Sequence, residues 1–434
     1  MDKMADVLGR AGAWFGQNKY LSAIKNAFQN FMPLTIAGAI GVLWCNVLVN
    51  DQTGLGLFFK PIMALDFLNP AFQAVNFCTI SCITVGITLG IAQEIGVWNM
   101  GAEKAGYIPG LVGLAAWLSV TNTSHMVEGA KEAFTGIAGN ELGATGLFTG
   151  MIIGVLSVEL FCFFEKQDAL KIKMPEQVPP GVARAFEVLV PATITLIITA
   201  CIGSACYNLT GLYLNDVIKN GIQGPLGAVG ATIPGVMIIY LVIMLFWLVG
   251  IHGNNMLSAV KEALFTPLAL ENVEKFNKGE KPTNIINMYA LQMWGEFGGS
   301  GVTIGLVIAI MIFGKREDNK AIASLSLVPG LFNINETVTF GIPMVLNPIL
   351  GIPFVVAPLI TIIIGYVLTV IGFCPVACLT VPWTTPPIVF GFLATGANVM
   401  GAVTQAILIV VSTVIYTPFL ISYEKYQNKQ AAEA

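Results

Sequence analysis

The stretch "VGATIPGVMIIYLVIMLFWLVGI", residues 229–251, contains no charged side chain and is long enough to cross the hydrocarbon core of a bilayer as a helix. Comparable apolar stretches recur along the 434-residue chain, which is 55% hydrophobic and only 11% charged. Backbone polar groups in lipid must be hydrogen-bonded within the protein, and the alternating pattern of a membrane β-barrel is absent from the sequence. The sequence therefore predicts an all-α polytopic membrane protein.

About ten crossings are expected, at residues 29–49, 71–93, 105–121, 145–165, 186–208, 229–251, 286–313, 349–373, 384–398 and 400–422. Basic residues in the N-terminal segment, in the 166–184 loop and at the C-terminal end predict that these three regions face the cytoplasm. The first 27 residues are predicted to form an interfacial amphipathic helix and not a cleaved signal peptide. The loop 314–320 conflicts with this topology, because counting crossings places it outside while its three basic residues favour the inside.

The two halves of the chain differ in their sequence patterns, and we predict a domain boundary between residues 222 and 223. Residues 1–222 contain glycines at small-xxx-small spacing, which is typical of close helix packing or of a dimer interface, so this half is predicted to be a scaffold. Residues 223–434 contain the interrupted segments 252–270, 324–348 and 374–391. Interrupted membrane helices are typical of a transporter's binding site, so this half is predicted to bind the substrate. The polar segment 122–143 is predicted to be a hairpin or a short lid.

Glu336 is the strongest candidate for a functional residue. It lies in "NINETVTFGIPMVLNP", residues 333–348, where a carboxylate at bilayer depth costs several kcal/mol unless it is paired, hydrated or protonated. Asn333 and Asn335 beside it can donate amide hydrogen bonds. A structural alternative is a carboxylate that caps a helix start by accepting from free backbone N–H groups.

His252 follows the apolar stretch 229–251 directly and opens "HGNN", in which Asn254 offers a further amide. Ionisable residues within such segments are usually functional, and a substrate or proton role is therefore predicted. The alternative is a histidine that caps the end of the preceding helix, where the helix dipole favours a cation.

Weaker candidates share a polar or aromatic group within apolar sequence. Glu296 in "MWGEFGGSG" is an acidic candidate that could instead pair with Lys261. Trp383 in "VPWTTPP" offers a flat face for a sugar ring, and a core tryptophan is an equally good interpretation. Asn76 is a further amide able to meet hydroxyl groups. Because amides and hydroxyls outnumber cations at depth, these residues favour a neutral polyhydroxylated ligand over an anion.

Several classes of site are excluded or disfavoured. With only two histidines and no CxxC among eight cysteines, the chain has no recognisable metal motif, and neither a metal nor another cofactor is expected. The cysteines are interpreted as buried apolar side chains. A net charge of −4 gives no indication of nucleic-acid binding.

Four motifs resemble the membrane-spanning IIC subunit of the bacterial phosphoenolpyruvate-dependent sugar phosphotransferase system, in its lactose/cellobiose/diacetylchitobiose branch. They are "MPLTIAGAI" (32–40), "FWLVGIHGNN" (246–255), "GLFNINETVTFGIPMVLNP" (330–348) and "VPWTTPP" (381–387). The resemblance implies a homodimer of ten-span protomers with re-entrant hairpins in the bacterial plasma membrane. It also implies that a disaccharide is bound and presented, through its C6 hydroxyl, to a separate soluble IIB subunit that carries a phosphocysteine supplied by IIA.

By this resemblance, Glu336 would accept a hydrogen bond from the C6 hydroxyl or remove its proton, and His252 would orient that hydroxyl. Asn333, Asn335 and Trp383 would be further sugar contacts. No phosphorylated residue is expected in the chain itself, because its cysteines all lie in or beside membrane sequence. A secondary transporter coupled to H⁺ or Na⁺, with Glu336 and His252 as a proton relay, is the alternative function.

Overall fold

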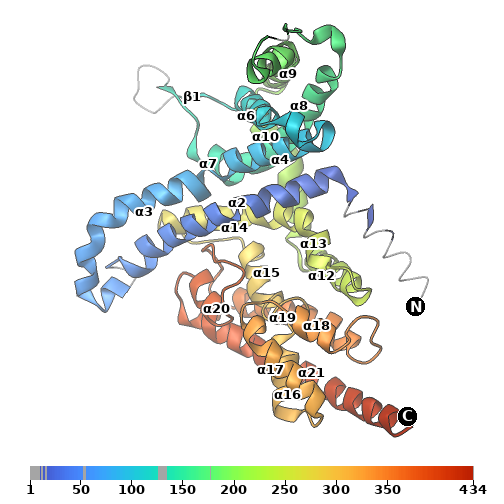
Figure 1. Cartoon of the computed structure of the whole chain (residues 1–434). Coiled ribbons are helices and arrows are strands. Elements are labelled where there is room, and N and C mark those ends of the chain that lie inside the picture. Colours follow the sequence, from blue (N-terminus) through green and yellow to red (C-terminus); the bar gives the residue numbers. More distant parts are fainter. Residues whose placement is uncertain are drawn as a thin grey trace. The chain divides into compact units, whose positions relative to one another are not determined.

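The computed structural model describes residues 10, 13–14, 17–51, 55–125, 134–175 and 177–433. The chain forms two compact units (Figure 1). The N-terminal unit comprises Gln17–Gly38 and Val75–Ala228, and the C-terminal unit consists mainly of Ala39–Ala74 and Val229–Ala434. The division after residue 228 lies close to the predicted boundary, whereas the assignment of Ala39–Ala74 to the C-terminal unit was not expected. An interfacial helix was predicted for the first 27 residues, of which 1–9, 11–12 and 15–16 lie outside the described residues, and residues 19–27 form the start of α2 (Lys19–Leu43).

The N-terminal unit is a helical bundle. Its helices are α4 (Ile83–Met100), α5 (Ala102–Ala105), α6 (Ile108–Val120), α7 (Gly139–Leu142), α8 (Ala144–Glu165), α9 (Pro180–Thr210) and α10 (Leu214–Ile218), together with most of α2 (Lys19–Leu43). Helix α4 packs against α6 and α8, and α6 packs against α9. A Cβ added to Gly150 would lie 2.2 Å from Oγ1 of Thr88, so glycine allows α8 to approach α4 closely.

The predicted hairpin within 122–143 is present. Strands β1 (Ser124–His125) and β2 (Phe134–Thr135) pair antiparallel, and residues 126–133 between them lie outside the described residues. This two-stranded sheet is the one departure from an all-α fold among the described residues.

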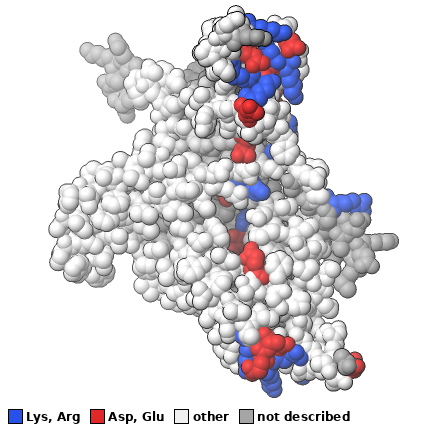
Figure 2. Space-filling model, in the orientation of Figure 1, with Lys and Arg blue, Asp and Glu red and all other residues white. Residues whose placement is uncertain are grey.

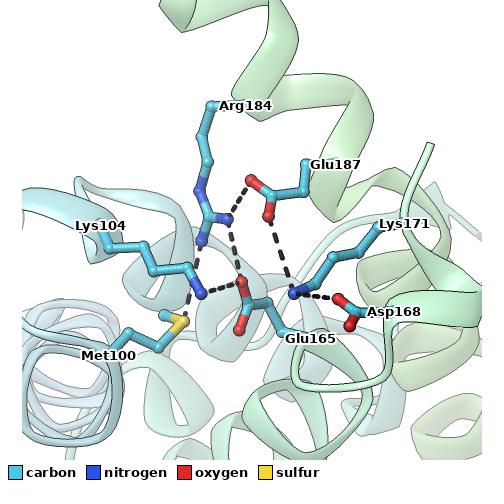
Figure 3. Close-up of polar contacts among 7 residues, drawn as sticks. All are labelled: Met100, Lys104, Glu165, Asp168, Lys171, Arg184 and Glu187. Carbon is cyan, nitrogen blue, oxygen red and sulfur yellow. Dashed lines mark hydrogen bonds and ion pairs between the residues drawn. The ribbon is translucent and has the colours of Figure 1, made fainter. Parts of the chain in front are cut away.

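Charged side chains gather where α8 and α9 meet, while most of the visible surface is uncharged (Figure 2). Figure 3 shows the ion-pair network that fixes this region. The buried carboxylate of Glu165 accepts from Nζ of Lys104 at 2.9 Å and from Nη1 of Arg184 at 3.0 Å. Arg184 also donates to Glu187 at 2.7 Å, and Nζ of Lys171 lies 3.8 Å from that same carboxylate. The 166–184 loop is therefore held against the helix ends by charge.

The C-terminal unit contains helices α12 (Ile233–Leu248), α13 (Gly253–Met256), α14 (Ser258–Asn277), α15 (Met288–Gly295), α16 (Ile304–Phe313), α17 (Glu317–Leu331), α18 (Glu336–Gly341), α19 (Gly351–Val370), α20 (Val389–Ala394) and α21 (Val399–Glu433). Two 3₁₀-helices, Leu55–Leu57 and Lys60–Leu68, precede α3 (Asn69–Asn76) and the π-helix Phe77–Ser81, and α11 (Gly224–Gly230) lies at the division between the units. Helix α21 packs along α16 and α19, around a core that includes Trp247, Trp294 and Phe354.

The predicted interruptions are real breaks. Helix α15 and the following Gly-rich loop are bent by 60° from α16. Segment 324–348 contains the end of α17, a loop and the six-residue α18. Residues 384–398 do not form the continuous short crossing that hydropathy predicted, because they contain only the six-residue α20 between turns. Pro386 and Pro387 before this helix, and Gly396 with φ of +76° after it, limit its length.

Among the described residues, five helices are long and apolar enough to cross a membrane, or up to seven if each of two bent pairs is one span. The shorter apolar helices α6 and α12 are additional. The chain is thus a helical membrane protein, as predicted.

The loop 314–320 is anchored to the C-terminal end of α21. The buried carboxylate of Glu424 accepts hydrogen bonds from the backbone N–H groups of Lys315 at 2.8 Å and Arg316 at 3.3 Å. Asn319 donates to Glu424 at 3.2 Å and to Gln427 at 2.9 Å. The loop and the C-terminal segment therefore lie on the same side of the bundle, which contradicts the count that placed the loop opposite the C-terminus.

Candidate functional site

The break after α12 places His252 at the start of α13. Gly250, with φ of +80°, lets the chain turn after the apolar helix. His252 is then the N-cap of α13, where its Nδ1 atom accepts the backbone N–H of Asn255 at 3.2 Å. Its ring lies 4.4 Å from that of the buried Trp247, measured between centroids. The histidine thus caps the helix that follows it, and not the preceding one as the structural alternative supposed.

Glu336 is the first residue of α18, and its carboxylate faces His252. Nε2 of His252 and Oε1 of Glu336 are 3.9 Å apart, and the two side chains are 38% and 47% exposed. This separation is too long for a direct hydrogen bond. An oxygen atom about 2.8 Å from both would fit between them. The two residues that the sequence singled out, 84 positions apart, are therefore brought together.

The helix cap also determines where the imidazole carries its proton. His252 lies outside the long apolar helices, and its burial lowers its pKa below the ordinary value, although the nearby Glu336 carboxylate acts in the opposite direction. In the neutral ring, Nδ1 accepts the Asn255 N–H, so the proton resides on Nε2. The pair consequently presents one N–H donor and one carboxylate acceptor to the space between them.

A glycine-rich loop, residues 298–301, connects the other candidates. Its backbone has φ of +69° at Gly298, +88° at Gly299 and +80° at Gly301, which favours glycine at each position. Nδ2 of Asn335, which is buried, donates to the carbonyl of Ser300 at 2.7 Å. Asn254 donates to Oγ of the same Ser300 at 2.9 Å, and its own Oδ1 is buried without a hydrogen-bond partner.

Asn333 joins three segments that are distant in sequence. Its Oδ1 accepts the backbone N–H of Gly298 at 2.7 Å. Its Nδ2 donates to the carbonyls of Trp383 and Thr385, at 3.0 Å in the case of Thr385. Asn333 itself has φ of +63°, a conformation that asparagine tolerates better than most residues. The amide group of Asn333 is thus used inside the protein to hold the loop that carries Trp383.

Trp383 lies in this loop with 44% of its surface exposed. A tryptophan of the core would be buried. The exposed Trp383 ring, in a loop held by Asn333, is better suited to stack against the apolar face of a ligand. Asn76 differs from the other candidates, because it lies in the N-terminal unit, where its Oδ1 is buried without a hydrogen-bond partner.

Glu296 forms the ion pair with Lys261 that the sequence left as one of two interpretations. Nζ of Lys261, on α14, contacts Oε1 of Glu296 at the end of α15. The hydroxyl of Tyr240 on α12 donates to the same Oε1 at 2.7 Å. The Lys261 and Glu296 side chains are 7% and 17% exposed.

Sequence reasoning missed Ser300 and Trp247 as parts of this region, and it treated Lys261 only as a possible partner. The signal for Ser300 was available, because a "GGSG" run between two apolar helices indicates a close backbone approach. A lysine within the apolar segment 252–270 was also a signal. Within the described ranges, no group of three or more His, Cys, Asp or Glu side chains could hold a metal ion.

Comparison with known proteins identifies the family. The family model described as "Phosphotransferase system, EIIC" matches residues 25–358. The chain is 32% identical to the oligo-beta-mannoside-specific EIIC component of Bacillus subtilis (strain 168), over 98% of this chain and 94% of that one. It is 30% identical to the cellobiose-specific EIIC component of Lactococcus lactis subsp. lactis (strain IL1403), over 98% of each chain.

A solved structure agrees with these relatives. The crystal structure of the transporter ChbC, the IIC component from the N,N'-diacetylchitobiose-specific phosphotransferase system, matches with a TM-score of 0.88 at 29% identity and covers 97% of each chain. The resemblance seen in the four sequence motifs is thereby confirmed. The chain belongs to the EIIC family of the phosphotransferase system.

Proposed function

We propose that this chain is a sugar permease that binds a disaccharide of the cellobiose or diacetylchitobiose class and presents its C6 hydroxyl for phosphorylation by a separate IIB subunit. The observation that carries the proposal is the 3.9 Å spacing of His252 and Glu336, which offers a donor and an acceptor to one hydroxyl. The cellobiose-specific relative and the solved structure of the N,N'-diacetylchitobiose transporter support this substrate class.

The two residues have distinct roles in this proposal. Glu336 accepts a hydrogen bond from the C6 hydroxyl, or takes its proton as the phosphoryl group arrives. Nε2–H of His252 donates a hydrogen bond to the oxygen of that hydroxyl. This orients the hydroxyl so that a lone pair of its oxygen is directed toward the incoming phosphoryl group. Trp383 stacks on the C–H face of a sugar ring, and Asn254 offers its unpartnered Oδ1 to another hydroxyl. Asn333 and Asn335 hold the surrounding loops.

The wider architecture is also part of the proposal. Ten crossings, both termini in the cytoplasm of a bacterial cell and a homodimer are expected. Apolar side chains exposed along α9, such as Leu189, Ile197 and Ile202, are suited to lipid or to a second copy. The soluble IIB and IIA partners bring the phosphate, and IIB docks on the cytoplasmic face at the 166–184 loop, which the network of Figure 3 keeps in place.

The test is the substitution Glu336→Gln in proteoliposomes supplied with the soluble partners and phosphoenolpyruvate. Because the amide keeps the shape but can neither carry charge nor take a proton, sugar binding should persist within about tenfold. Formation of sugar phosphate should fall by about 100-fold or more. His252→Ala should weaken both binding and phosphorylation.

The control is Glu274→Gln, a carboxylate-to-amide change near a helix end, where the one ion pair of Glu274 among the described residues is that with Lys278 at 2.6 Å. It should leave binding and phosphorylation unchanged. Normal sugar phosphate formation in Glu336→Gln would refute the role of Glu336. Accumulation of unmodified sugar driven by a proton gradient would instead favour a secondary transporter.

A further inference from the structure

The Lys261 and Glu296 side chains form an ion pair that is far less exposed than His252 and Glu336, and the function proposed above assigns it no role. Both donors to Glu296, the ammonium of Lys261 and the hydroxyl of Tyr240, reach the same oxygen, Oε1. Among the described residues, no partner of Oε2 is found. An ion pair that served packing alone would be expected to use both oxygens, because a carboxylate has about four acceptor positions.

The surroundings of the pair place it at the candidate site. Glu296 ends α15 and lies two residues before the glycine-rich loop, whose Ser300 contacts Asn254 and Asn335. Both charges also lie close enough to His252 to act on its imidazole. Lys261 is nearly inaccessible, whereas Glu296 retains more exposed surface, so the carboxylate is the accessible member of the pair.

Two contacts fix the orientation of the Glu296 carboxylate, and a third holds its two donors together. Lys261 approaches it from α14 and Tyr240 from α12, and the Lys261 ammonium also lies 5.6 Å from the centroid of the Tyr240 ring. Tyr240 is completely buried, so its hydroxyl cannot turn to solvent. A carboxylate held in one orientation accepts hydrogen bonds more strongly than a neutral group.

We propose that Lys261 and Tyr240 are positioning residues that hold the Glu296 carboxylate with Oε2 free to accept a hydrogen bond from one hydroxyl of the sugar other than the C6 hydroxyl. This inference rests on the proposed function, because it requires a sugar at this site. It assigns to Glu296 the recognition of one hydroxyl, and to Lys261 and Tyr240 the orientation that makes this recognition selective.

The experiment measures binding of cellobiose and its monodeoxy analogues to the purified full-length protein and its variants. Loss of a hydrogen bond to a charged group costs about 10- to 100-fold in affinity. We expect one analogue, lacking a hydroxyl other than that at C6, to show this penalty in the wild type. In Glu296→Gln the penalty should shrink to a few-fold. Tyr240→Phe should reduce the penalty. Lys261→Met should remove most of the penalty, whereas Lys261→Arg, which keeps the charge, should retain most of it.

A folded control is needed, because Lys261→Met leaves a buried carboxylate without its cation. The double variant Lys261→Met/Glu296→Gln removes both charges and should fold, again without the selective penalty. The 6-deoxy analogue serves as the internal control, since its penalty reports on His252 and Glu336 and should persist in every variant. Equal penalties for all other hydroxyls in the wild type and in Glu296→Gln would overturn the inference. Absence of a 6-deoxy penalty in the wild type would instead overturn the proposed function.

Discussion

The hydrogen bond from Asn255 to Nδ1 of His252 determines what the imidazole can offer to a ligand. With Nδ1 occupied as an acceptor, the neutral ring has its single N–H at Nε2, on the side of Glu336. Protonation would convert this neutral donor into a cation facing a carboxylate. The two groups would then attract each other directly and compete with a bridging hydroxyl.

This electrostatic change leads to a pH-dependent prediction. Burial lowers the pKa of His252 from its ordinary value of 6.5, so the imidazole is neutral at pH 7 and becomes charged only below that value. Sugar affinity should therefore be constant between about pH 7.5 and pH 6.5, the ordinary pKa of histidine. Below that pH it should fall by about tenfold as the imidazole takes up its proton. Isothermal titration of the purified protein with cellobiose across this range checks the prediction.

The matched control for this titration is His252→Gln, whose side chain can supply a donor but does not titrate. Its affinity should be lower than that of the wild type and should lose the part of the pH dependence that His252 causes. An identical pH profile in wild type and His252→Gln would show that another group is responsible.

At the scale of single residues, the sequence indicated which polar side chains would be close together, but not how each would be used. Glu336 and His252 could be predicted because ionisable groups are costly in apolar sequence. The amides of Asn333 and Asn335 looked equally available, yet their donors go to the backbone of Trp383, Thr385 and Ser300. Such loop-to-loop bonds depend on tertiary structure, which local sequence does not determine.

At the scale of elements, the candidate site depends on broken helices and on the left-handed backbone around them. The non-glycine residues with positive φ among the described residues are Val302, Asn333, Leu346, Ile388 and Ala397. All of them lie in the C-terminal unit, in or beside the loops that connect its helices. Strained backbone of this kind persists only where surrounding contacts hold it, and it is typical of functional sites.

Gly299 provides a direct test of the glycine-rich loop. Its φ is +88°, and an added Cβ would lie 2.6 Å from Cγ of Asn335. Gly299→Ala should therefore lower the free energy of unfolding by about 1–3 kcal/mol and displace the Asn335 amide from Ser300. We expect a lower thermal unfolding midpoint in detergent together with weaker sugar binding.

Gly279 supplies the matched control for this substitution. Its φ of +73° is similarly strained for alanine, but an added Cβ would meet no atom within 4 Å. Gly279→Ala should cost some stability and leave sugar affinity unchanged. If both variants bind sugar like the wild type, the glycine-rich loop does not support the site.

Hydropathy predicted the long helices of the chain well, since α8, α9 and α19 fall within or close to expected crossings. It could not show that residues 384–398 contain only the six-residue helix α20, whose start is capped by a side chain of another helix. Gln405 of α21 accepts the backbone N–H groups of Ile388 and Gly391 at 2.8 and 2.7 Å, capping that short helix. An apolar segment with prolines has the same hydropathy whether it crosses a membrane or turns back within it. Hydropathy contains no information about such hydrogen-bond partners.

At the scale of the whole molecule, composition was sufficient to predict a helical membrane protein. It did not predict that Ala39–Ala74 belongs with the C-terminal unit. One contact there is the hydrogen bond of Asn46 to Asn277, 231 residues later, at 3.3 Å. Long-range pairings of this kind are set by the folded packing and leave no periodic signal in the sequence.

The anchoring of loop 314–320 to the end of α21 gives a prediction about topology. Glu424 binds the backbone of Lys315 and Arg316, so the loop and the C-terminal segment must reach the same aqueous compartment. Their basic residues are Lys315, Arg316, Lys320, Lys425 and Lys429, and they favour the cytoplasm.

Cysteine labelling tests this prediction. Single cysteines at Lys315 and Lys425, which are both exposed, should be labelled by an impermeant thiol reagent in inverted vesicles and not in intact cells. The exposed Cys78 and Cys201 are first changed to serine to remove background labelling, and the resulting variant without new cysteines is the control. Labelling of the two positions from opposite sides would contradict the anchoring, whereas labelling of both in intact cells would reverse the proposed orientation.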